Sequence, residues 1–104
     1  MKLLIVTCLK EDRKAAANIL DRAGVQVFSA SETTGFRNQP EENLLDSWFA
    51  HDHTQYNAVF IFSFTQSQQA DRALKLIQEH NAAEQSPFPL RAFVVPVEDA
   101  SHKP

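Results

Sequence analysis

The sequence predicts an α+β domain of the ferredoxin-like βαββαβ type, a four-stranded antiparallel sheet with two helices on one face. Short apolar runs rich in β-forming residues alternate with two stretches of helical spacing. The order strand, helix, strand occurs twice, as in the split βαβ arrangement. The 104 residues suit a single domain, which we expect over residues 1–98, followed by a polar tail over residues 99–104.

The first half of this order consists of three segments. Residues 3–8 are continuously apolar, which predicts a buried strand. Residues 11–23 repeat alanine, isoleucine and leucine at helical spacing, and Gly24 is placed to end this helix in the left-handed conformation. Residues 25–34 are then expected to form the second strand.

A polar segment separates the second strand from the third. We expect residues 35–55 to form an inter-strand loop with a short helix, because Pro40 suits the first turn of a helix. Residues 58–64 form the strongest strand pattern in the chain.

The second helix and the last strand complete the order. Thr65 and Gln68 have the spacing of a capping box, and the apolar residues that follow recur at helical spacing. Residues 81–89 are expected to form a loop and residues 91–97 the last strand. Pro96 favours an edge position for that strand, which leaves the first and third strands in the centre.

Both faces of the expected sheet are apolar. Alternating side chains point to opposite faces, and both sets are apolar in residues 3–8, 58–64 and 91–97. Two helices cover one face, and exposing a few hundred Å² of apolar surface costs several kcal/mol at roughly 25 cal/mol per Å². We therefore expect a closed homo-oligomer. The alternative is that the loop around Trp48 and Phe49 folds over the sheet within one chain.

Composition excludes several classes of protein. The net charge is −3 and the basic residues are scattered, which disfavours nucleic acid as a partner. A single cysteine, Cys8, permits no internal disulfide and suits a reducing compartment. No apolar stretch is long enough to cross a membrane, so we expect a cytoplasmic protein without membrane insertion.

Nearly the whole chain resembles the PII-like signalling superfamily. The resemblance is carried by residues 1–7 (MKLLIVT), 22–25 (RAGV), 58–65 (AVFIFSFT) and 88–98 (FPLRAFVVPVE). It implies a ferredoxin-like subunit, a homotrimer with its sheets facing inward, and ligand clefts between subunits. It also implies a non-enzymatic protein that acts on a regulated partner such as a transporter or an enzyme. The trimeric divalent-ion-tolerance proteins look like more distant relatives.

Two segments depart from the classical PII pattern. Residues 35–55 contain no tyrosine, so control by uridylylation is not expected. Residues 85–89 contain two prolines where classical members have a glycine-rich turn, and proline lacks the N–H group that such a turn offers to phosphates. Nucleotide binding of the classical kind is therefore not expected.

Two arginines are the cations nearest the expected cleft between subunits. Arg37 and Arg91 are candidates for holding an anionic ligand, and Arg91 has Glu98 as an alternative partner. Cys8 is expected to be a small buried core residue, because no histidine at a fixed spacing supports a nucleophile.

A histidine pair suggests a divalent metal ion, the one cofactor to which the sequence points. His51 and His53 lie two residues apart, so in an extended segment both imidazoles project to one side, and Asp46 or Asp52 would add an oxygen ligand. The alternative is a solvated loop. A separate apolar stripe predicts either partner docking or packing between subunits, and it comprises Leu44, Leu45, Trp48 and Phe49.

Three functions follow from these patterns. The first is a PII-like trimeric regulatory or sensor protein that binds a small ligand or ion at subunit clefts. The second is a metal-homeostasis protein that uses His51 and His53. The third is a small ferredoxin-like enzyme with a loop histidine as acid or base, which no carboxylate pair in the sequence supports.

Overall fold

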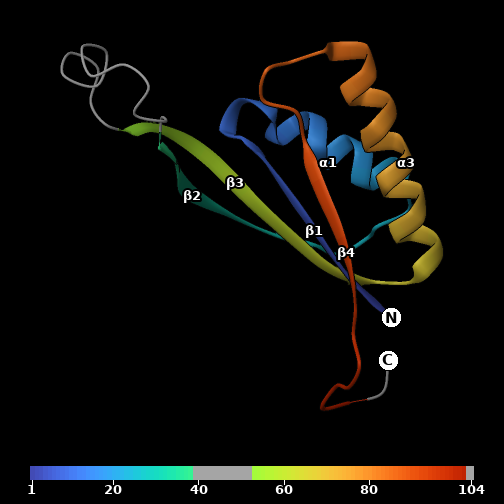
Figure 1. Ribbon diagram of the computed structural model, residues 1–104. Coiled ribbons are helices and arrows are strands. Elements are labelled where there is room, and N and C mark those ends of the chain that lie inside the picture. Colours follow the sequence, from blue (N-terminus) through green and yellow to red (C-terminus); the bar gives the residue numbers. More distant parts are fainter. Residues whose placement is uncertain (39–52, 103–104) are drawn as a thin grey trace, which may run out of the picture.

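The strands of the chain form one four-stranded sheet. The computed structural model describes residues 1–38 and 53–102. In chain order its elements are β1 (Lys2–Leu9), the 3₁₀ helix η1 (Lys10–Asp12), α1 (Arg13–Arg22), β2 (Ser29–Asn38), β3 (His53–Thr65), α3 (Ser67–Glu84) and β4 (Arg91–Pro96), as shown in Figure 1. The strands pair antiparallel in the order β2-β3-β1-β4, so β1 and β3 are central. The predicted fold class is confirmed.

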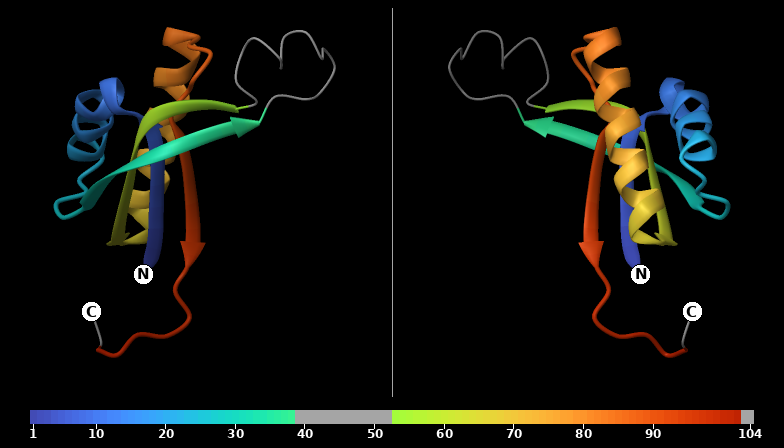
Figure 2. Two further views of the ribbon diagram at one scale, coloured as in Figure 1. Left: turned by 90° about the vertical axis from the view of Figure 1, so that its left-hand side faces the viewer. Right: turned by 90° about the vertical axis from the view of Figure 1, so that its right-hand side faces the viewer.

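Both helices lie on the same face of this sheet (Figure 2). The core lies between the two layers, where β1 contributes Leu4 and Val6 and β3 contributes Val59 and Ile61, all almost fully buried. The helices meet this face with small and branched side chains, among them Ala16, Ile19 and Leu20 of α1 and Ala73 and Ile77 of α3. The helical spacing in the sequence therefore corresponds to burial.

The opposite face of the sheet is also apolar, and we call it the open face. The strand register aligns its side chains in rows across β3, β1 and β4: Phe62, Ile5 and Phe93 in one row, and Phe64, Leu3 and Val95 in the next. Phe64 is 58% exposed and Phe93 55% exposed, so the described residues leave these rings in contact with solvent. The prediction that both faces are apolar is confirmed.

The second strand lies further along the chain than predicted. Residues 25–28 connect α1 to the sheet, and β2 begins at Ser29. The reason is the end of α1: Gly24 has φ +84°, as expected, and the N–H of Val25 donates to the carbonyl of Leu20 at 2.9 Å. Val25 is thus used to close the helix and fill the core rather than to extend the sheet.

The β2–β3 hairpin reaches into the segment that was expected to be a loop. Residues 35–38 belong to β2 and residues 53–55 to β3, because the antiparallel ladder continues from Thr34–Asn57 to Asn38–His53. Residues 53–57 pair with β2 and not with β1. We call the two-stranded part, residues 34–38 and 53–57, the ribbon; it projects beyond the end of β1 (Figure 1). The predicted short helix near Pro40 lies outside the described residues.

The start of α3 differs from the capping-box prediction. The N-cap is Gln66 rather than Thr65, and it makes no side-chain capping bond. The helix then continues to Glu84, beyond the predicted loop boundary, and ends at Gln85 with φ 50°. Pro96 closes the edge strand β4, as predicted. Within the described residues, no helix has the length and apolarity needed to cross a membrane.

Candidate functional site

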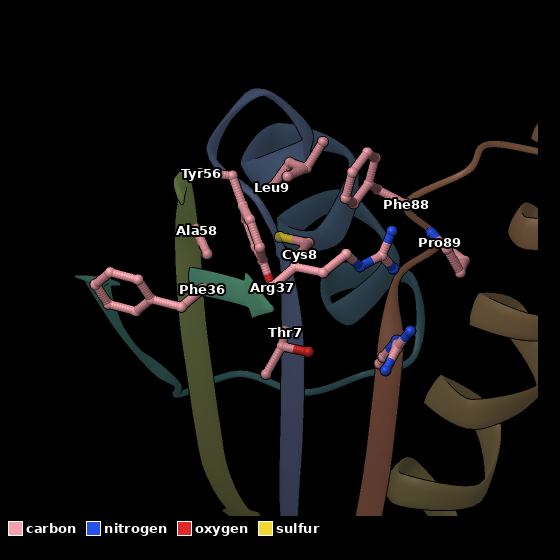
Figure 3. Close-up of a pocket in the computed structure, with 10 residues that line it drawn as sticks. Thr7, Cys8, Leu9, Phe36, Arg37, Tyr56, Ala58, Phe88 and Pro89 are labelled. Carbon is pink, nitrogen blue, oxygen red and sulfur yellow. The ribbon is translucent and has the colours of Figure 1, made fainter. Parts of the chain in front are cut away.

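A cavity of about 300 Å³ opens where the ribbon leaves the sheet. Its walls come from the end of β1, from the ribbon, and from the loop that joins α3 to β4. Figure 3 shows the residues that line it: Thr7, Cys8, Leu9, Phe36, Arg37, Tyr56, Ala58, Phe88, Pro89 and Arg91. Arg37, Tyr56 and Phe88 turn toward one another in this view, whereas the ring of Phe36 points away from them.

Two aromatic rings and a guanidinium group join the ribbon to the loop. The ring centroids of Tyr56 and Phe88 are 5.8 Å apart, with their planes inclined at 50°. The guanidinium carbon of Arg37 lies 5.3 Å from the centroid of the Phe88 ring, which is a cation–π distance. Phe88 therefore contacts two side chains of the ribbon.

Gly35 makes room for the Tyr56 ring. The two residues are direct partners across β2 and β3. A Cβ atom on Gly35 would overlap the carbons of the ring and lie 2.6 Å from its hydroxyl oxygen. The absence of a side chain at position 35 thus lets the ring lie across the strand and form one wall of the cavity.

The loop from Gln85 to Leu90 forms the opposite wall. Neither Pro87 nor Pro89 has an N–H group, and the N–H of Phe88 is used in a 3.0 Å bond to the hydroxyl of Ser86. This wall therefore offers the aromatic ring of Phe88 to a ligand, rather than a series of backbone N–H donors. Arg91 follows at the start of β4, paired in the ladder with Thr7.

The described residues place two positive charges on the cavity and no carboxylate paired with them. Within residues 1–38 and 53–102, the ion pairs are those of Glu32 with Lys10, at 3.3 Å, and with Arg13, at 3.9 Å. Arg37 and Arg91 form no such pair there, and the alternative pairing of Arg91 with Glu98 is not observed. Two guanidinium groups on one cavity favour an anion, since each can donate two parallel hydrogen bonds to a carboxylate or phosphate.

Cys8 borders the cavity but is buried, with 6% of its surface exposed. Burial, and to a lesser degree the nearby carboxylate of Asp12, raise the pKa of its thiol to about 11. The reactive thiolate is therefore scarce at neutral pH, so Cys8 is not an activated nucleophile.

The structure does not test most of the other predicted site residues. His51 lies outside the described residues, and so do Asp46, Asp52 and the apolar stripe of Leu44, Leu45, Trp48 and Phe49. The backbone of His53 begins β3 opposite Asn38. In the part of the chain that the structure describes, no three side chains of His, Cys, Asp or Glu gather as metal ligands would. Arg37 and Arg91, by contrast, line one cavity.

Sequence reasoning missed Tyr56, Gly35 and Phe88 as site residues. Tyr56 precedes the predicted start of the third strand, and its contact with Phe88 joins positions far apart in the sequence. The one local signal was Phe88 itself, an aromatic residue between two prolines, which is unusual in a polar loop.

Comparison with known proteins gives structural matches alone. No protein-family model and no curated protein sequence matches the chain. Among solved structures, GlnK of B. subtilis superimposes with a TM-score of 0.70 at 13% identity, over 93% of this chain and 84% of GlnK. A PII-like signalling protein of Thermus thermophilus superimposes with a TM-score of 0.57 at 15% identity, over 89% and 82% of the two chains.

A third match is CPII, a nitrogen regulatory PII-like protein of Thiomonas intermedia K12 in complex with ADP, AMP and bicarbonate. It superimposes with a TM-score of 0.59 at 16% identity, over 95% of this chain and 93% of CPII. The identities are low, so the likeness concerns the fold. The chain therefore has the fold of the PII-like signalling proteins, as the resemblance in its sequence predicts.

Proposed function

We propose that the chain is a PII-like regulatory protein that binds a small anion in the cavity and catalyses no reaction. The fold supports a regulatory role of this kind. The observation that carries the binding proposal is the placement of Arg37 and Arg91 on one cavity without a carboxylate partner among the described residues. The unactivated thiol of Cys8 supports the non-enzymatic part.

The ligand that we propose is a small anion of the kind bound by CPII, namely bicarbonate or an adenine nucleotide. Guanidinium groups form bidentate hydrogen bonds with both carboxylate-like and phosphate oxygens, and Phe88 offers an apolar surface beside them. The two prolines of the loop remove backbone donors that a polyphosphate would use. Bicarbonate and AMP are accordingly expected to bind more tightly than ADP.

We also propose that the open face is the subunit interface of a homotrimer in the cytoplasm, with a regulated protein as further partner. Exposed rings such as Phe64 and Phe93 support this, because covering them removes apolar surface from water. Sedimentation should give three times the subunit mass of 11.7 kDa. A single species of subunit mass at micromolar concentration would contradict the trimer.

A thermal-shift series tests the ligand proposal. Bicarbonate, AMP and ADP are added in turn, because a ligand that binds the native state raises the melting temperature. The shift should disappear in Arg37→Ala and Arg91→Ala, and should persist in Arg22→Ala, which removes an exposed arginine of α1 away from the cavity. Equal shifts in all four proteins, or no shift with any of the three anions, would refute binding at this cavity.

A further inference from the structure

One residue outside the cavity fastens both ends of the loop that forms its second wall. Asn81 lies near the end of α3. Its side-chain amide donates to the carbonyl of Leu90 at 2.8 Å and accepts from the N–H of Leu90 at 3.0 Å. Its own carbonyl accepts from the N–H of Gln85 at 3.0 Å. A single asparagine thus holds the first and the last residue of the segment 85–90.

The rest of this loop has few bonds of its own. Pro87 and Pro89 donate none, and the bond from Phe88 to Ser86 is local and exposed. The loop nevertheless places Phe88 against the ribbon and leads directly into Arg91. The position of both cavity residues therefore depends on the two anchored ends.

We infer that Asn81 is a positioning residue of the anion site. It lines no part of the cavity and acts through Leu90. The side chain of Leu90 is buried, and its backbone N–H and carbonyl each form a hydrogen bond with the Asn81 amide, which fixes the start of β4. Its amide holds Phe88 beneath Arg37 and holds Arg91 on the same cavity as Arg37. The binding part of this inference rests on the proposed function; the positioning part does not.

Two variants and a matched control test it. Asn81→Ala removes both amide bonds to Leu90, and Asn81→Asp keeps the acceptor but removes the donor. Ile77→Val, which trims a core side chain one turn earlier on the same helix, is the control for a general loss of stability. If Asn81→Ala fails to fold, the nearly isosteric Asn81→Asp carries the experiment.

The first readout needs no ligand. The side-chain protons of Arg37 lie over the Phe88 ring, so their NMR resonances should carry a ring-current shift that Phe88→Leu abolishes. We expect both Asn81 variants to lose most of this shift and Ile77→Val to keep it. The positioning role is refuted if the shift is intact in both Asn81 variants, or if Ile77→Val loses it equally.

The second readout is the dissociation constant of bicarbonate or AMP by titration calorimetry. Asn81→Ala should raise it by about tenfold or more, and Ile77→Val should leave it near the native value. Unchanged affinity in both Asn81 variants would overturn the link to binding. If the native chain binds neither probe while the Asn81 variants lose the ring-current shift, the proposed ligand is wrong and the positioning role stands.

Discussion

At the scale of single residues, one wall of the cavity depends on the absence of a side chain at Gly35. Gly35 does not require an unusual backbone conformation; it is required because the Tyr56 ring occupies the space of its Cβ. Tyr56 in turn contacts Phe88. A larger side chain at position 35 would therefore displace the Tyr56 ring and, through it, the Phe88 ring. A change of one methyl group at this position is therefore expected to affect binding as well as stability.

Gly35→Ala should reduce the free energy of unfolding by about 1–3 kcal/mol, the usual range for overpacking. The ring of Tyr56 must leave its position, so the thermal shift with bicarbonate or AMP should also fall. Ser31→Ala, two pairs earlier on the same face of β2, is the matched control and should leave both quantities nearly unchanged. A melting temperature of Gly35→Ala within about a degree of the native value would contradict the overlap.

Cys8 gives the chain a pH dependence at the alkaline end. Burial, with help from Asp12, raises the pKa of the thiol from 9.0 to about 11, so between these values the unfolded chain has released a proton that the folded chain retains. The free energy of unfolding should therefore fall as pH rises from about 9 to 11, by on the order of 2 kcal/mol. Denaturant titrations of the native chain and of Cys8→Ala should show a steeper fall for the native chain; parallel curves would contradict the shift.

At the scale of elements, α3 begins without a side-chain cap. The backbone of Gln66 already has N-cap geometry, with φ −77° and ψ 155°. Gln66→Asp should therefore add a capping bond and raise the free energy of unfolding by about 0.5–1 kcal/mol.

Thermal denaturation measures this gain against Gln68→Asp. The control adds the same charge to the first turn of α3 but leaves the N-cap unchanged, so its effect should be smaller. Equal melting temperatures for the two variants would mean that charge alone, and not the cap, accounts for the change.

Most of the elements could be predicted because their apolar patterns coincide with burial. Residues 3–8 and 58–64 lie in strands, as do residues 91–96 of the predicted last strand, and α3 buries the alanine and isoleucine positions that its spacing indicated. The errors lie where a contact overrides a pattern. Val25 alternates like a strand residue, yet its N–H closes α1. The ribbon is mostly polar and has no continuous apolar run, so its pairing across the ladder, and not its pattern, identifies it as strand.

The candidate site was predictable only in part. Arg37 and Arg91 were expected near a cleft between subunits, which the family resemblance implies. They line one cavity within the subunit, and both the cleft between subunits and their role as anion ligands stay predictions. The contacts of Phe88 with Tyr56 and Arg37 depend on how a loop crosses the ribbon. No local pattern encodes such a crossing, because the partners are distant in the sequence.

At the scale of the whole molecule, the open face is the surface through which we propose that the subunit meets other copies. Phe62 and Phe93 flank Ile5 in the middle of this face, with no charged residue between them. Phe62→Lys combined with Phe93→Lys should therefore bring like charges together at the proposed interface and shift the assembly to single subunits.

Sedimentation equilibrium measures this change. The control adds two lysines at exposed helical positions, Asn18→Lys with Gln78→Lys, and should sediment like the native chain. An unchanged mass for the double phenylalanine variant would show that another surface forms the assembly.

The two walls of the cavity should differ in how easily they unfold locally, because one of them is the ribbon. Arg37 and Tyr56 stand on two strands whose ladder partners, among residues 1–38 and 53–102, are each other, and such a pair of strands is marginal by itself. Phe88 and Arg91 stand beside a helix and a central strand. Amide hydrogens of residues 34–37 should thus exchange with deuterium long before those of β1, and an anion that ties Arg37 to Arg91 should slow the former selectively. The wall that carries Phe88 and Arg91 would then be rigid without ligand, whereas the wall that carries Arg37 and Tyr56 would become rigid only when the anion is bound.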